Sequence, residues 1–184
     1  MHPQKRKLRL TLLLILFLIL FIAKTANAKW QIYKNQQFNI EFLTISEPKE
    51  FRLLDDSKEL RVLWHIGFME DELSGGVEAH RLKDGSLRGF SVTENAPYIR
   101  DGFDQSLKSK VVSQKNIFVN SVPAIEFRTT TTSKKGILYH GVARVLLIDD
   151  TMYNIFIISK NKDRLIKEDV AKYLDSLRVI SKNK

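Results

Sequence analysis

The hydrophobic positions of this chain recur with a period of two residues through most of its length. Phe38, Ile40 and Phe42 alternate with polar residues just after an apolar segment at 30–33, and this predicts a β-hairpin with one buried face. Residues 61–69 alternate most regularly. They predict a strand whose buried face carries Val62, Trp64, Ile66 and Phe68.

The flanking segments have weaker patterns. Residues 44–60 are predicted to be a loop. Residues 70–76, which begin with three acidic residues and end with Gly75-Gly76, are predicted to form a turn into a strand at 77–82. Asp84-Gly85 predicts another turn, with a short strand near Phe90. Residues 95–110 are predicted to form a short amphipathic helix, because apolar residues recur there every four positions: Ile99, Phe103 and Leu107.

The last third predicts four consecutive strands, at 117–119, 122–131, 137–148 and 152–159, joined by short turns. This order is typical of an antiparallel meander. Both faces of the final strand are apolar, so we expect it to be covered on both sides. Residues 162–177 then predict a helix with an apolar stripe of Ile166, Val170, Tyr173, Leu174 and Leu177. Its outer face carries Arg164, Glu168, Lys172 and Asp175.

Together these elements predict one α+β domain without internal repeats. We expect a mainly antiparallel sheet, an N-terminal β-hairpin and a C-terminal helix packed on the sheet.

The N-terminal residues have the order of a secretory signal peptide. Four basic residues precede an apolar run at 12–23, and Ala26 and Ala28 supply the small residues that signal peptidase requires. We therefore predict cleavage before Lys29, with residues 1–28 as signal and 29–184 as the domain. The run is shorter than the roughly 20 apolar residues of a membrane span. The alternative is a signal helix retained as an anchor.

Composition narrows the possible functions. The chain has no cysteine, which excludes disulfides, thiolate metal sites and a lipid-modified N-terminal cysteine. Five of the 30 Lys and Arg residues and none of the 21 acidic ones lie within 1–28, so the remainder carries 25 basic and 21 acidic residues. These charges are interspersed, unlike the basic stripe of a nucleic-acid-binding domain. We expect a soluble exported protein, periplasmic or secreted, that meets the inner membrane only transiently.

Three segments carry a family resemblance. They are the Tyr33 to Phe42 hairpin with its Phe-Asn-Ile-Glu-Phe text, the Val-Asn-Ser-Val-Pro-Ala-Ile-Glu-Phe run at 119–127, and the Tyr-Leu-Asp-Ser-Leu run at 173–177. In this order, around a β-meander, they resemble the PsbP-like superfamily, particularly its small exported bacterial members of unassigned role. The chain departs from the family at Leu43-Thr44, where members often have proline, and at Ser121, where they often have glycine. The resemblance implies an α/β/α sandwich, in which helices cover both faces of a central antiparallel sheet. It also implies binding or assembly assistance and no catalysis, and it identifies no functional residues.

The candidate chemistry is sparse. His65, His80 and His140 lie on predicted strands without metal-ligand spacing, and the acidic groups Asp55-Asp56, Asp149-Asp150 and residues 70–72 lie at predicted turns. There is no GxSxG, GxGxxG or P-loop. Trp64, Phe68, Phe127 and Tyr153 are expected in the core.

We therefore expect an exported non-catalytic domain that binds a protein or cell-envelope component, with no catalytic, cofactor or metal residues. Two alternatives stay open. One is a small envelope hydrolase or metal-binding protein, which requires two histidines to converge with a carboxylate in a cleft. The other is a signal-anchored envelope protein.

Overall fold

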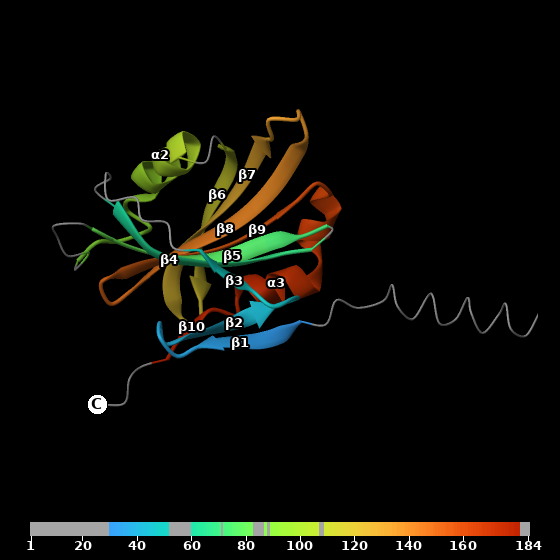
Figure 1. Ribbon diagram of the computed structural model, residues 1–184. Coiled ribbons are helices and arrows are strands. Elements are labelled where there is room, and N and C mark those ends of the chain that lie inside the picture. Colours follow the sequence, from blue (N-terminus) through green and yellow to red (C-terminus); the bar gives the residue numbers. More distant parts are fainter. Residues whose placement is uncertain are drawn as a thin grey trace, which may run out of the picture.

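The computed structural model describes residues 30–51, 60–70, 72–82, 87, 89–106 and 109–180. Its centre is a seven-stranded sheet in which every neighbouring pair is antiparallel. Figure 1 shows the strands in the order β3-β4-β5-β9-β8-β7-β6. They are β3 (Lys49–Phe51), β4 (Leu60–Met69), β5 (Ser74–Leu82), β9 (Thr151–Ser159), β8 (Leu138–Ile148), β7 (Val122–Thr132) and β6 (Ser109–Val119).

A second, three-stranded sheet holds the N-terminal hairpin. β1 (Gln31–Asn35) and β2 (Ile40–Thr44) pair antiparallel, and β10 (Arg178–Val179) adds to β2. The hairpin forms as predicted because its alternate apolar residues have a core to face. Ile40 and Phe42 are buried in the same cluster as Trp64 of β4 and Val170 of the C-terminal helix.

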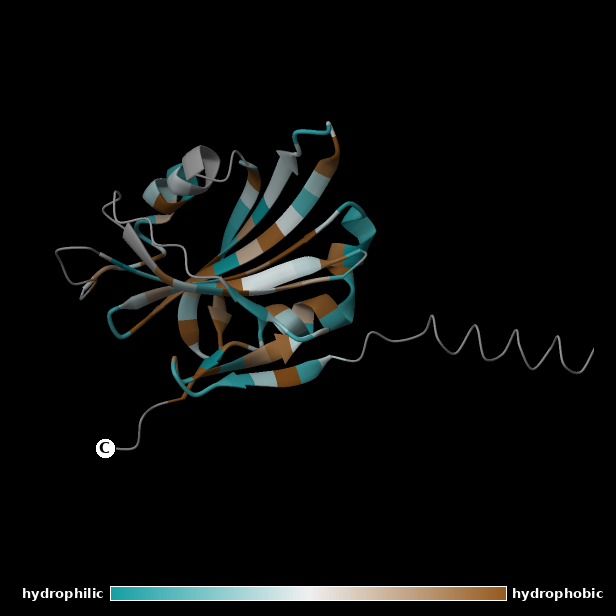
Figure 2. Ribbon diagram, viewed as in Figure 1, coloured by the Kyte–Doolittle hydropathy of each residue, from teal (hydrophilic) through white to brown (hydrophobic). Residues whose placement is uncertain are grey.

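Helices cover the two faces of the large sheet. η1 (Lys162–Ile166) and α3 (Glu168–Leu174) pack on one face with the hairpin, and α2 (Ala96–Ser106) packs on the other. Along β9, Tyr153, Ile155 and Ile157 belong to the larger core, and Met152 belongs to the smaller core beneath α2. Figure 2 shows hydrophobic residues along the central strands β8 and β9, as expected for strands covered on both sides.

The predicted α+β class, the hairpin, the meander β6-β7-β8-β9 and the helix docked on the sheet are confirmed. Tight turns produce the meander. Asn120 and Ser121 both have positive φ, 48° and 68°, in the two-residue turn between β6 and β7. Such a turn matches the twist of the flanking strands. Asp149, with φ 54°, has the same role between β8 and β9, which confirms that Asp149-Asp150 is a turn.

The prediction that Gly75-Gly76 forms a turn is wrong, because both residues lie inside β5. A Cβ on Gly75 would lie 2.9 Å from the Phe68 ring, and one on Gly76 would lie 2.6 Å from the carbonyl oxygen of Ile66. These glycines permit close approach within the sheet. The tyrosine hydroxyl of Tyr173 lies 3.0 Å from the carbonyl oxygen of Gly76 and also contacts that of Phe156.

The single helix predicted over 162–177 is two shorter helices. Lys167 has extended backbone, with ψ 148°, and this interrupts the helical phase between η1 and α3. The apolar stripe is shifted as a result: Leu165 is buried, whereas Ile166 is 66% exposed. Val170, Tyr173, Leu174 and Leu177 are buried as predicted.

Other boundaries differ where the hydrophobic pattern is weak. No strand forms at Phe90, whose amide donates instead to the carbonyl of Leu87 in a turn. The helix predicted at 95–110 ends at Ser106, and β6 begins eight residues before the predicted strand at 117. Most of β6 is exposed and so has no apolar alternation. The short strands β3 and β10 carry too few residues to form a pattern. Three other predictions lie outside the described residues: Asp55-Asp56, Asp84-Gly85 and Leu107.

Candidate functional site

The first polar cluster is centred on Glu78 of β5. His65 Nδ1 lies 2.8 Å from Glu78 Oε1, and His80 Nε2 lies 3.3 Å from Glu78 Oε2. Asn154 Nδ2 of the neighbouring strand β9 donates to Oε2 at 3.2 Å. The side chains come together because His65, Glu78 and Asn154 occupy one row across β4, β5 and β9.

The histidines determine the protonation state of this carboxyl group. Burial by itself raises the pKa of Glu78, but hydrogen bonds and charge interactions with His65 and His80 outweigh it and hold the pKa well below its ordinary value of 4.5. Glu78 is therefore an ionised acceptor to which both imidazoles donate. The cluster ties β4 and β9 to β5 through side chains, in addition to the backbone hydrogen bonds of the sheet.

Two of the three histidines, His65 and His80, converge on the Glu78 carboxylate, which is the convergence that the hydrolase or metal-binding alternative requires, whereas His140 lies apart from them. His140 lies on β8 in alternation with Val142 and Leu146, both in the larger core, whereas Glu78 and His80 alternate with the core residues Val77 and Ala79 and face the other side of the sheet. Within the part of the chain that the structure describes, no group of three or more His, Cys, Asp or Glu side chains could hold a metal ion.

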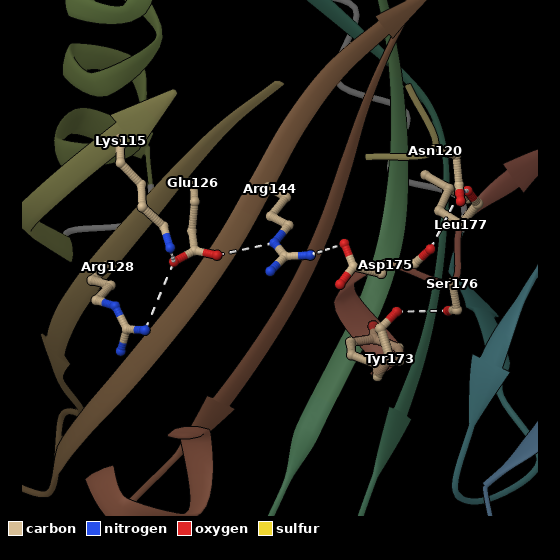
Figure 3. A network of polar contacts seen from close by, with 9 residues as sticks. All are labelled: Lys115, Asn120, Glu126, Arg128, Arg144, Tyr173, Asp175, Ser176 and Leu177. Atoms are coloured by element: carbon tan, nitrogen blue, oxygen red, sulfur yellow. Dashed lines mark hydrogen bonds and ion pairs between the residues drawn. The ribbon is translucent and has the colours of Figure 1, made fainter. Parts of the chain in front are cut away.

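The second polar cluster lies on the opposite face of the sheet, the face that carries α3. Figure 3 shows its side chains. Glu126 of β7 is 3% exposed, and Arg144 Nε of β8 donates to its Oε2 at 3.0 Å. Its other oxygen, Oε1, lies 3.2 Å from Lys115 Nζ of β6 and 3.7 Å from Arg128 Nη2. One buried carboxylate thus faces three cations, two of which are solvent-accessible.

The same cluster fixes the end of α3. Arg144 also pairs with the carboxylate of Asp175, and Asn120 of the β6-β7 turn donates to the carbonyl oxygens of Asp175 and Leu177. Ser176 Oγ donates to the carbonyl of Tyr173 and accepts from the amide of Leu43 on β2. Polar contacts therefore join the meander to the end of α3, as Figure 3 shows, and the Leu43 amide joins the hairpin to Ser176.

Strand β6 forms one edge of the large sheet. Among the described residues it pairs with β7 alone, and seven of its eleven residues are exposed. Phe118 is 72% exposed although it is a large aromatic side chain. The opposite edge strand, β3, has only three residues. We call residues 112–118 of β6 the β6 edge, and it is the candidate binding surface.

The sequence-predicted residues fall in different places. Ala26, Ala28, Lys29 and Asp71 lie outside the described residues. Glu70 is described, and it lies in the turn between β4 and β5, where its amide donates to the carbonyl of Leu73 at 2.8 Å. Trp64, Phe68, Phe127 and Tyr153 are buried, which confirms them as core residues.

Sequence reasoning did not find the two carboxylates at the centres of these clusters. A signal existed at Glu126, which stands between Ile125 and Phe127 in an apolar strand that is buried on both faces. A charge at such a position requires a partner. Nothing in the sequence identified Arg144 as that partner, because the register of β7 and β8 brings the two together.

The comparisons bear on the fold. No family model matches the chain, and no curated protein matches it. The solution structure of cyanobacterial PsbP (CyanoP) from Synechocystis sp. PCC 6803 matches with a TM-score of 0.57 and 13% identity, covering 84% of this chain and 94% of that one. A protein of unknown function from Pseudomonas aeruginosa matches with a TM-score of 0.40 and 9% identity, covering 77% of this chain and 90% of that one. This match adds nothing to the assignment of the fold.

The chain therefore has a PsbP-like fold. At this level of identity the likeness assigns the architecture and not the partner. Searched over its described part, the structure has no helix long and apolar enough to cross a membrane.

Proposed function

We propose that this chain is an exported binding domain that takes up a protein or cell-envelope component through the β6 edge and performs no reaction on it. The observation that carries the proposal is the β6 edge, residues 112–118, which among the described residues pairs with β7 alone and has mostly exposed side chains. An edge strand of this length presents backbone donors and acceptors to another chain, and folded proteins usually cover or shorten such edges. The PsbP-like fold supports the proposal because the resemblance to this superfamily implies binding or assembly assistance.

The polar clusters support the same function. The Glu126 cluster and its extension to Asp175 hold β6, β7 and β8 against α3, so the edge strand is part of a rigid framework. Binding surfaces placed on rigid elements lose less conformational entropy when they meet a partner.

Export is the second part of the proposal. The order of basic residues, apolar run and small residues at 1–28 supports cleavage before Lys29, with Ala26 and Ala28 in the peptidase site. Intact mass spectrometry of protein from the envelope fraction should give a chain that starts at Lys29. A mass that includes residues 1–28 would favour the signal-anchored alternative.

Photo-crosslinking in the native cell tests the binding surface. A photoreactive amino acid at Gln114 or Asn116, both exposed on β6, should yield a discrete crosslinked species. The same group at Lys172, exposed on α3, is the matched control and should not. A partner captured at Lys172 and not on β6 would contradict the assigned surface.

A further inference from the structure

The β6 edge has two chemically different rows of side chains. The register with β7 places Lys115 opposite Glu126 and Ser113 opposite Arg128, on the face that carries α3. Gln114, Asn116 and Phe118 lie opposite Phe127, Ile125 and Pro123, on the face that carries α2. A strand added to this edge would continue both rows.

The α3-side row is positively charged. β6 contains two lysines and no acidic residue, and the adjacent Arg128 is 40% exposed. Three cations, Lys115, Arg128 and Arg144, surround the single carboxylate of Glu126. Within the described part of the chain, only Arg144 has a second acidic partner, Asp175. The exposed end of this cluster therefore has positive charge that the described residues do not balance.

This charge distinguishes between possible occupants of the edge. A second copy of the chain pairing through β6 would place the lysines of two identical strands near one another, and like charges across strands are destabilising. An acidic strand would supply the missing counter-charge to Lys115 and Arg128. Charge complementarity thus favours a different chain with carboxylates on one face.

We propose that the β6 edge binds an extended acidic segment of a partner protein by antiparallel strand addition. The inference rests on the proposed function and specifies its partner chemistry. Antiparallel pairing continues the direction of every neighbouring pair in the large sheet. The backbone provides affinity, and the two rows of side chains provide specificity.

The register specifies a sequence pattern for the partner. The partner residues that lie opposite Lys115 and Ser113 are two positions apart in the partner strand and share one face of it, so both should be acidic. The carboxylate opposite Ser113 can extend over this small side chain toward Arg128. The residue opposite Phe118 lies three positions before the first acidic residue, on the other face, and should be hydrophobic. In the antiparallel direction the pattern is hydrophobic-x-x-Glu-x-Glu.

Labelled synthetic peptides test the pattern against protein purified after export. The first is an extended peptide of about ten residues that contains the pattern, and the second has the same composition with both glutamates moved by one position, onto the Phe118 side. We expect the first to bind about tenfold more tightly by fluorescence anisotropy, and its affinity to fall between about 0.1 M and 1 M salt. Equal affinities would overturn the proposed register.

Amide hydrogen exchange and two variants locate the peptide. Binding should slow exchange of β6 amides that do not donate to β7, which a peptide held only by side-chain charge would not do. Lys115→Glu should weaken binding about tenfold, whereas Lys172→Glu, of similar exposure on α3, should not. Unchanged β6 exchange with bound peptide would overturn strand addition. If no acidic peptide binds while photo-crosslinking at Gln114 still captures a partner, this inference fails and the proposed function stands.

Discussion

The indole Nε1 of Trp30 donates a hydrogen bond of 3.0 Å to Oδ2 of Asp169, which lies 139 positions later in the chain. The indole ring also stacks on Tyr173, with centroids 5.2 Å apart, and meets Phe68 edge to face. Asp169 is held in place by two hydrogen bonds from the guanidinium of Arg164. The first described residue is thus anchored to the C-terminal helix.

Substitutions at Trp30 should separate the hydrogen bond from the aromatic packing. Trp30→Phe removes the donor and part of the indole but keeps an aromatic ring, and should cost about 1–2 kcal/mol of unfolding free energy. Trp30→Ala also removes the ring from Tyr173 and Phe68 and should cost about 2–4 kcal/mol. Urea unfolding measures both, and equal losses would show that the stacking contributes nothing.

Stability should decline in acid because the carboxyl groups of Asp169 and Glu78 have depressed pKa values. The hydrogen bonds from Arg164 lower the pKa of Asp169 from 3.8 to about 2, against a smaller rise from burial and with further lowering by the bond from Trp30. A carboxyl group with a lowered pKa in the folded state contributes its stability above its ordinary pKa and loses it as the pH falls. For Asp169 this loss occurs between about pH 4 and pH 2. Glu78 contributes in the same direction below pH 4.5.

Urea midpoints measured across this pH range test the assignment. Asp169→Asn should be less stable than the native chain at neutral pH, and the difference should shrink as the pH falls toward 2. A constant difference would mean that the Arg164 pair does not depend on the charge of Asp169.

Val170 and Lys172 provide a matched pair on α3. Val170 is completely buried in the larger core, so Val170→Asp would place an unpaired carboxylate under the helix and should cost about 3 kcal/mol or more. Lys172 is 66% exposed and, among the described residues, pairs with the exposed Glu168, so Lys172→Asp should leave the unfolding midpoint nearly unchanged. Similar unfolding midpoints for the two variants would show that α3 is not docked. Arg164, predicted from sequence to lie on an outer face, is half-buried and paired, and is therefore no control.

The Glu126 and Arg144 pair should show strong coupling. Arg144→Leu leaves the buried carboxylate without its closest partner and should cost about 3 kcal/mol, and Glu126→Leu leaves a guanidinium in the same position. The double variant removes both charges together and should lose less than the sum of the two single variants. A double-mutant cycle by urea unfolding measures this, and additive losses would contradict a direct interaction.

Sequence reasoning was most accurate where one face of an element is buried. The period of two at 61–69 and along the meander predicted β4, β7, β8 and β9, because alternate side chains meet the core. It was least accurate for β6, whose exposed side chains show no alternation, and for the C-terminal helix. There the extended backbone at Lys167 shifted the buried face by one residue, from Ile166 to Leu165.

By itself the sequence determined the class of fold, the hairpin, the meander and most of the core, since each depends on local periodicity and composition. Only the tertiary structure decided which charged residues meet. His65, Glu78 and Asn154 become neighbours through strand pairing, as do Glu126 and Arg144, and strand pairing depends on backbone register over long separations. The strand order also decided that β6 is an edge, because an edge is defined by the partner that a strand lacks.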